Sequence, residues 1–179
     1  MTLAVVILAA GLGKRMRSRL PKVLHPLAGK PLLAHVLDAA HRIGAERRVV
    51  VFGHGGDLVR AALAEHDCHW VEPAVRDADR VLVLYGDVPL ISPATLERLI
   101  AVSAGTDLGL LTAELDDPTG YGRILRDTAG RVIRIVEEKD ASPAERAIRE
   151  INTGFLIADR ARLDDWLARS EGAGPPAAE

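Results

Sequence analysis

A continuous apolar run near the start of the chain, Leu3–Ala9, is the feature that most limits what the chain can fold into. A strand with one wet face alternates apolar and polar residues, whereas a strand inside a parallel sheet is covered on both faces and reads as an unbroken apolar run. Two further apolar strands are predicted at residues 48–52 and 80–85, with helical spacing before each of them. This alternation predicts an α/β fold in which a mostly parallel sheet lies between layers of helices.

Local signals predict the remaining elements. A small antiparallel insertion is expected within residues 120–140, because residues 127–130 carry a hairpin turn signal between two strand-like segments. Capping residues and periodicity predict five helices: one after Pro31, one capped by Asp57, one after Ser92, one with a capping box at Ser142, and one at residues 159–168. Two further strands are predicted at residues 107–115 and 151–158.

Composition and charge narrow the classes of protein. The 179 residues carry a formal net charge of -2, which does not favour nucleic acid or an anionic membrane as a partner. No apolar run approaches the roughly 20 residues of a membrane helix, and the first residues lack the basic leader of a signal peptide. Cys68 is the single cysteine, and the six histidines show no metal-ligand spacing. These features predict a cytoplasmic protein with no nucleic-acid or membrane partner.

The loop after the first strand combines glycines with positive charge. Glycines let backbone N–H groups approach phosphate oxygens, and a dense group of cations suits a polyphosphate. The alternative is a solvated basic loop after an ordinary turn. The dinucleotide-binding fingerprint is excluded because Met16 stands where it needs glycine, and the Walker loop is excluded because Arg15 stands where it needs Ser or Thr. Five cations fall within nine residues: Lys14, Arg15, Arg17, Arg19 and Lys22.

Polar residues follow two other groups of predicted strands. Asp87 comes after the strand at 80–85, and a carboxylate there can hold Mg2+ against phosphate oxygens, with a turn cap as the alternative reading. Gly122, Glu137 and Asn152 each follow or end a strand, and such side chains can bind sugar hydroxyls; turn or capping chemistry is the alternative. Ligands of open α/β sheets bind beyond the carboxyl ends of the strands.

Together these segments resemble the sugar-1-phosphate nucleotidyltransferases. The opening loop LAAGLGKRMRSRLPKVLHPLAGKPL is shared across that family. The segments GHGGDLV, LYGDVPLI, DDPTGYGRI, IVEEKDA and EINTGFLIA narrow the resemblance to the N-terminal pyrophosphorylase domain of the bacterial bifunctional N-acetylglucosamine-1-phosphate uridylyltransferases. The resemblance runs from about Val5 to Trp166 and implies a Rossmann-like three-layer nucleotide-diphospho-sugar transferase fold.

The resemblance also implies an activity and a set of site residues. The activity is Mg2+-dependent uridylyl transfer from UTP to N-acetylglucosamine 1-phosphate, giving UDP-N-acetylglucosamine and pyrophosphate for peptidoglycan and lipopolysaccharide synthesis. Arg15 and Lys22 would act on phosphate charge at the reacting centre, and Asp87 would bind the metal. The other implied substrate-binding residues are Leu8, Ala9, Ala10, Gly11, Tyr85 and Gly86 for the nucleotide, and Gly122, Glu137 and Asn152 for the amino sugar.

The chain departs from the family pattern between Trp70 and Arg80. The family has a glutamine-rich, uracil-contacting segment with Gly-Thr-Gly-His-Ala there. About a dozen or more of its residues have no counterpart in this chain, which is a large difference when loops in such folds are typically short. The motifs on both sides of the gap are intact, so we expect the natural protein to be longer than 179 residues. The alternatives are a related sugar-1-phosphate nucleotidyltransferase of other specificity, or a non-catalytic nucleotide-sugar-binding remnant.

The resemblance implies a domain organisation as well. Residues 1–170 are expected to form the nucleotidyltransferase domain and residues 171–179 a mobile tail. A later Gln-Gly-Glu-Tyr-Tyr segment, a metal-binding asparagine and the β-helix acetyltransferase domain of the family have no counterpart in the sequence. Because that β-helix makes trimers in the family, the oligomeric state stays open.

Overall fold

The computed structural model describes residues 2–10, 16, 18, 20–53, 55–70 and 77–172. The chain divides into two compact units: unit 1 contains Met1–Gly109 and Ile157–Glu179, and unit 2 contains Leu110–Leu156. Two strands, β6 (Leu108–Glu114) and β9 (Glu150–Asp159), carry the chain between the units.

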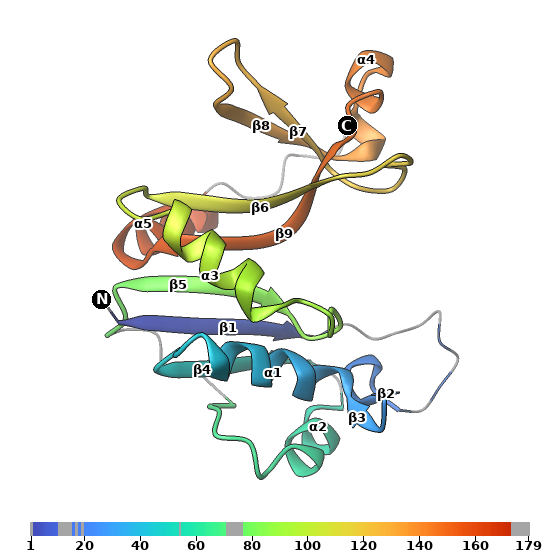
Figure 1. Cartoon of the computed structure of the whole chain (residues 1–179), viewed down its shortest axis with the longest axis vertical. Helices are drawn as coiled ribbons and strands as arrows, with labels where there is room; N and C mark the ends of the chain where they lie inside the picture. Colours follow the sequence, from blue (N-terminus) through green and yellow to red (C-terminus); the bar gives the residue numbers. More distant parts are fainter. Residues whose placement is uncertain are drawn as a thin grey trace. The chain divides into compact units, whose positions relative to one another are not determined.

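Unit 1 is built on a parallel sheet whose central strand is β1 (Leu3–Ala9). β4 (Arg47–Phe52) pairs with one side of β1 and β5 (Arg80–Tyr85) with the other, both in parallel, and the three strands lie side by side in Figure 1. Ala4, Val5 and Ile7 are fully buried. The unbroken apolar run therefore marks the strand that is covered on every side, as the sequence predicted.

Helices of unit 1 lie where the apolar periodicity predicted them. Figure 1 shows α1 (Leu32–Arg42) and α3 (Pro93–Val102) in front of the strands. The inner side of α1 buries Leu33, Val36 and Leu37. At the start of α3 the Ser92 hydroxyl accepts a hydrogen bond from the Thr95 N–H at 3.1 Å, which satisfies one of the free donors of the first turn. The last helix of the unit is α5 (Arg160–Gly172).

The start of α2 (Gly56–Ala62) differs from the prediction that Asp57 caps it. Gly55 is the N-cap residue, and its backbone φ is 83°, a value that residues with a side chain rarely adopt. A Cβ atom on Gly56 would lie 1.9 Å from the ring of Phe52, so only glycine fits there. Packing against β4, and not side-chain capping, therefore decides where this helix begins.

A short segment before α1 was not predicted. It contains a 3-10 turn, η2 (Lys22–Leu24), and a two-stranded hairpin of β2 (Pro26–Leu27) and β3 (Lys30–Pro31). Its tip holds Ala28 and Gly29 at φ values of 50° and 80°. Two residues per strand are too few to give a sequence periodicity, which explains why the pattern missed them.

Unit 2 contains the antiparallel insertion that the turn signal predicted. β7 (Arg123–Arg126) pairs antiparallel with β8 (Val132–Val136) and, through Arg123 and Ile151, with β9. The Asp127 carboxylate accepts backbone hydrogen bonds from Ala129 and Arg131 in the turn. α4 (Pro143–Arg146) begins with the predicted capping box of Ser142 and Glu145.

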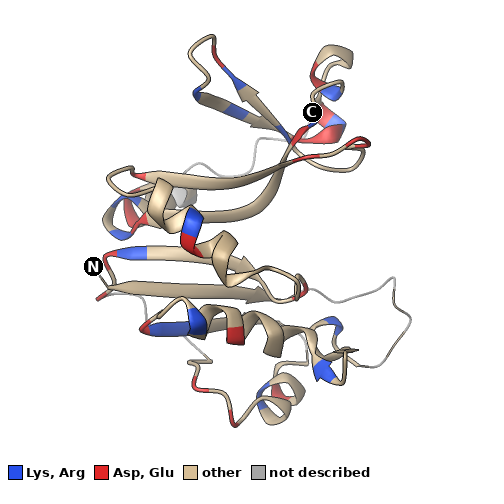
Figure 2. Cartoon of the chain, viewed as in Figure 1, with Lys and Arg blue, Asp and Glu red and all other residues tan. Residues whose placement is uncertain are grey.

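Charges of both signs cover unit 2 and are largely paired. Figure 2 shows acidic and basic positions along the β7–β8 hairpin and α4. Arg126 contacts Glu150 at 2.6 Å and Arg131 contacts Asp127 at 2.7 Å.

The α/β fold class, with a mostly parallel sheet and a small antiparallel part, is confirmed. Across the described part of the chain, none of the helices has both the length and the apolar character that crossing a membrane requires. α5 reaches Gly172, and residues 173–179 of the predicted tail lie outside the described residues.

Candidate active site

A pocket of about 260 Å³ opens at the carboxyl ends of β1 and β5. This is the edge of a parallel sheet where α/β proteins bind their ligands, because the loops that follow neighbouring strands meet there. Three chain segments that are far apart in sequence line the pocket: Leu8, Ala9 and Ala10 from the end of β1, Lys22 and Val23 from η2, and Tyr85 and Asp87 from the end of β5.

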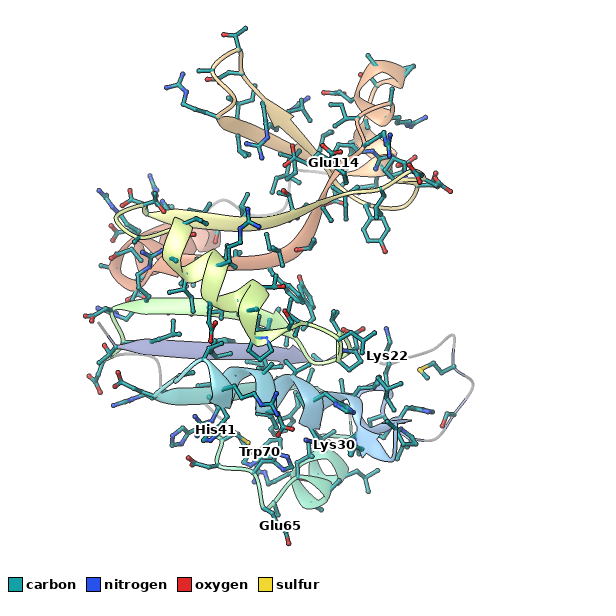
Figure 3. All side chains as sticks on the ribbon, viewed as in Figure 1. Lys22, Lys30, His41, Glu65, Trp70 and Glu114 are labelled. Atoms are coloured by element: carbon teal, nitrogen blue, oxygen red, sulfur yellow. The ribbon has the colours of Figure 1, made fainter. Side chains whose placement is uncertain are left out.

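An ion pair between Lys22 and Asp87 lies at this pocket. The Lys22 Nζ donates to Asp87 Oδ2 at 2.5 Å, across 65 positions of sequence. Figure 3 shows Lys22 on the side of the sheet where the β1 and β5 arrows end. The side chains are 39% and 29% exposed, so both groups can be reached by a ligand. The fold thus brings a cation and a carboxylate from distant parts of the sequence into contact at the pocket.

Gly86 sets the position of Asp87. Its N–H donates to the Leu8 carbonyl at 3.0 Å, which extends the β1–β5 pairing by one residue. A Cβ atom on Gly86 would lie 3.1 Å from Leu33 Cδ1 and 3.3 Å from Val23 Cγ1. The absence of a side chain therefore lets the backbone pass between α1 and η2 and deliver the next residue, Asp87, to the pocket.

The pocket fits a metal ion that arrives with phosphates, and does not form a closed metal cage. No group of three or more His, Cys, Asp or Glu side chains in the described residues is arranged to hold a metal. Mg2+ commonly takes one or two carboxylates and completes its octahedron with water and substrate phosphate oxygens. Asp87 lies half-buried at the pocket and has a carboxylate of the type that Mg2+ prefers.

Unit 2 brings together the three residues predicted to contact a sugar. The Asn152 N–H donates to the Gly122 carbonyl at 2.8 Å. A Cβ atom on Gly122 would lie 3.2 Å from Glu137 Oε1, so the carboxylate lies directly beside the glycine. The Asn152 Oδ1 accepts from the Gly154 N–H at 3.0 Å, which holds the amide group in place.

Most of the predicted nucleotide residues thus share one pocket, with Gly86 adjoining it. Gly11 and Arg15 lie outside the described residues. Val23 also lines the pocket, but a single apolar residue after a proline and a lysine carries no signal that could have marked it.

Residues 5–150 match the model of the MobA-like NTP transferase domain. The chain belongs to the MobA-like NTP transferase family. Together with the relatives below, this membership makes the chain a nucleotidyltransferase.

Similar proteins of known sequence are named bifunctional protein GlmU. The chain is 61% identical to the one from Azoarcus sp. over 91% of its length, and 58% identical to the one from Aromatoleum aromaticum over 92%. It spans 39% and 40% of the length of these relatives. The Azoarcus alignment is 178 residues long although it includes only 91% of this chain, so the relative has internal residues that this chain lacks.

Solved structures support the fold of this family member. The CMP:2-keto-3-deoxy-manno-octonic acid synthetase complexed with CTP matches with a TM-score of 0.70 at 20% identity, covering 94% of this chain and 78% of that one. HddC from Yersinia pseudotuberculosis matches with a TM-score of 0.67 at 24% identity, covering 92% and 80%.

Proposed function

We propose that this domain transfers the uridylyl group of UTP to N-acetylglucosamine 1-phosphate, giving UDP-N-acetylglucosamine and pyrophosphate, with Mg2+. The observation that carries the proposal is the Lys22–Asp87 pair at the sheet edge of a MobA-like NTP transferase domain. The identity to proteins named GlmU supports this choice of substrates. The resemblance would place the reaction in the cytoplasm, ahead of peptidoglycan and lipopolysaccharide synthesis.

The proposed reaction is an in-line displacement at phosphorus. A phosphate oxygen of the sugar phosphate forms a bond to the α-phosphorus of UTP, and the bond from that phosphorus to the bridging oxygen breaks to release pyrophosphate. The nucleophile is already an anion, so no protein base is needed. The obstacle is the repulsion between two anions, and positioning and charge stabilisation therefore supply most of the catalysis.

The described residues of unit 1 supply the parts that such a displacement needs. Lys22 would neutralise phosphate oxygens, and its ammonium already lies at the pocket. Asp87 would hold the metal ion, which when bound neutralises phosphate charge and orients the phosphate oxygens. Ala9 and Ala10 carry only methyl groups, which leaves room beside the backbone for a nucleotide. Arg15 and Gly11 complete the proposed phosphate loop.

Unit 2 would hold the amino sugar. Glu137 and Asn152 offer a carboxylate and an amide, which suit the hydroxyl and amide groups of N-acetylglucosamine. Gly122 lies beside Glu137 without a side chain of its own, so its backbone can approach a ligand closely. We propose residues 1–170 as the nucleotidyltransferase domain to which all these residues belong.

Pyrophosphate release measured with four nucleoside triphosphates and several sugar 1-phosphates tests the proposal. The expected result is the highest kcat/KM for UTP with N-acetylglucosamine 1-phosphate, and no release without a divalent cation. A different best pair would replace the proposal by a related transferase of other specificity.

A non-catalytic remnant is the second candidate function. It is favoured by one observation: the Azoarcus relative has internal residues without counterparts here. Nucleotide binding in calorimetry without pyrophosphate release from any substrate pair would support this candidate over the enzyme.

A further inference from the structure

Arg123 is a charged residue with a side chain that is only 1% exposed. It begins β7, the strand that pairs with both β8 and β9. Burying a guanidinium is costly unless its donors find acceptors. A charge placed at the centre of such a small unit therefore calls for an explanation beyond packing.

The guanidinium of Arg123 bonds to two distant segments of unit 2 and to the loop just before its own strand. Its Nη2 lies 2.5 Å from Glu138 Oε2, and its Nε donates to the Arg146 carbonyl at 3.4 Å. Its Nη1 donates to the Tyr121 carbonyl. Arg146 strengthens the link, because its own Nε donates to the Glu138 carbonyl at 3.2 Å.

Each of these segments leads directly to a proposed sugar-binding residue. Tyr121 precedes Gly122 and Glu138 follows Glu137 in the chain. Arg146 ends α4, which leads into β9 and Asn152. A single side chain thus ties together the three stretches of backbone whose spacing decides where the sugar-binding groups lie.

Arginine has the shape that this task needs. Its planar fork presents several donors in fixed directions, whereas a lysine ammonium is a point charge on a flexible stem. An apolar residue would fill the volume at a lower desolvation cost but would hold none of the three segments.

We infer that Arg123 is a positioning residue for the sugar phosphate: it does not contact the substrate but fixes the loop, strand end and helix that carry Gly122, Glu137 and Asn152. The inference rests on the proposed function. It separates the two substrates, because within the described residues the hydrogen bonds of Arg123 go to unit 2, whereas residues of unit 1 line the nucleotide pocket.

Steady-state kinetics of Arg123→Met test the inference. The KM for N-acetylglucosamine 1-phosphate is expected to rise about tenfold to a hundredfold, since displacements of about 1 Å have effects of that size. The KM for UTP is expected to stay within about twofold, because residues of unit 1 line the nucleotide pocket. A packing role alone would change both KM values together, so the split between them distinguishes the two roles. Arg123→Lys, which keeps the charge but not the fork, should give a smaller rise with the same split.

The matched control is Arg126→Met on the same strand. Arg126 also makes a two-pronged ion pair, with Glu150, but its side chain is 40% exposed, and its hydrogen bonds go to Glu150 and Gly130 instead of Tyr121, Glu138 or Arg146. Both KM values should stay within about twofold of wild type in this variant.

Each outcome separates the inference from the proposed function. An equal rise of both KM values, or no change in either, overturns the positioning role while wild-type turnover still supports uridylyl transfer. If Arg123→Met does not fold, as judged by circular dichroism, Arg123→Lys carries the test and must show the split. If the wild type prefers another sugar phosphate, uridylyl transfer to N-acetylglucosamine 1-phosphate fails, and the same split measured with that substrate still supports the inference.

Discussion

At the scale of single residues, the Lys22–Asp87 pair links the sequence motifs to chemistry. Both side chains are partly exposed, and ion pairs in such positions contribute at most about 1 kcal/mol to stability. The pair therefore matters for binding phosphates and metal more than for folding. Its two members can be tested separately, because each has a different proposed partner.

Lys22→Ala is expected to lower the turnover number by about a hundredfold or more, because it removes a cation positioned at developing phosphate charge. The free energy of unfolding, measured in urea, should change by less than about 1 kcal/mol. Lys30→Ala is the control, because Lys30 also pairs with an aspartate, Asp38, but does not line the pocket. Near-normal pyrophosphate release from Lys22→Ala would overturn the assigned role.

Asp87→Asn is expected to raise the Mg2+ concentration that gives half-maximal activity. The amide keeps the shape of the side chain but removes the negative charge that a hard cation prefers. A Mg2+ titration of initial rates measures the change, and thermal unfolding checks that the fold is kept. A half-maximal concentration equal to that of wild type would exclude Asp87 as a metal ligand.

At the scale of elements, contacts between a helix and a strand can decide where the helix begins, in addition to the local sequence signals. The aromatic ring of Phe52 at the end of β4 packs near Trp70, with ring centres 6.1 Å apart, and Arg60 lies 5.5 Å over the Phe52 ring. Gly56 passes beneath the same ring. This cluster holds α2 against the sheet, and a change in any member should be felt by the helix.

Gly56→Ala is expected to lower the free energy of unfolding by about 1–3 kcal/mol, because the added methyl group overlaps the Phe52 ring and forces a shift. Urea unfolding measures the loss. Gly56→Ala combined with Phe52→Leu should recover part of it, since the smaller side chain yields space. Leu58→Ala, at a residue that is 56% exposed on the same helix, should change stability by less than about 0.5 kcal/mol.

The ion pair between β7 and β9 should make stability depend on pH. Hydrogen bonds from Arg126 hold the pKa of Glu150 below its ordinary value of 4.5. The folded state thus favours the carboxylate, and this stabilisation is complete above the ordinary pKa and disappears as the pH falls through the lower, folded pKa. Arg126→Met should therefore be less stable than wild type at about pH 6, and the difference in urea unfolding should shrink as the pH falls below the ordinary pKa of Glu150. A difference that persists at low pH would contradict the ion-pair explanation.

At the scale of the whole molecule, the chain passes from β4 to β5 through α2 and a single residue pair beside β4. After α2 the chain returns beside β4 in parallel, where Val49 pairs with His69. The chain then continues to β5, which pairs with the other side of β1.

We predict that the natural protein has additional residues between Trp70 and Arg80. The internal residues that the Azoarcus relative has in addition support this prediction. Intact-mass spectrometry of the protein from its native cells should give a mass above 19.2 kDa. Tryptic peptides must place the excess between these two residues. A mass at that value would mean a true deletion, and poor discrimination among nucleotides would then be expected.

The sequence by itself determined the elements that depend on neighbouring residues. The apolar run of β1, the Ser142 capping box and the turn at Asp127 were all predicted, because burial periodicity and local hydrogen bonds act over a few positions. The resemblance in motif order also assigned Lys22 and Asp87 to one site.

Only the tertiary structure decided the contacts between distant segments. The 2.5 Å approach of Lys22 to Asp87 and the bonds of Arg123 to Glu138 and to the Arg146 carbonyl arise from chain segments that meet in space. No local pattern encodes them, because their energies depend on the packing of elements that are separated by many residues.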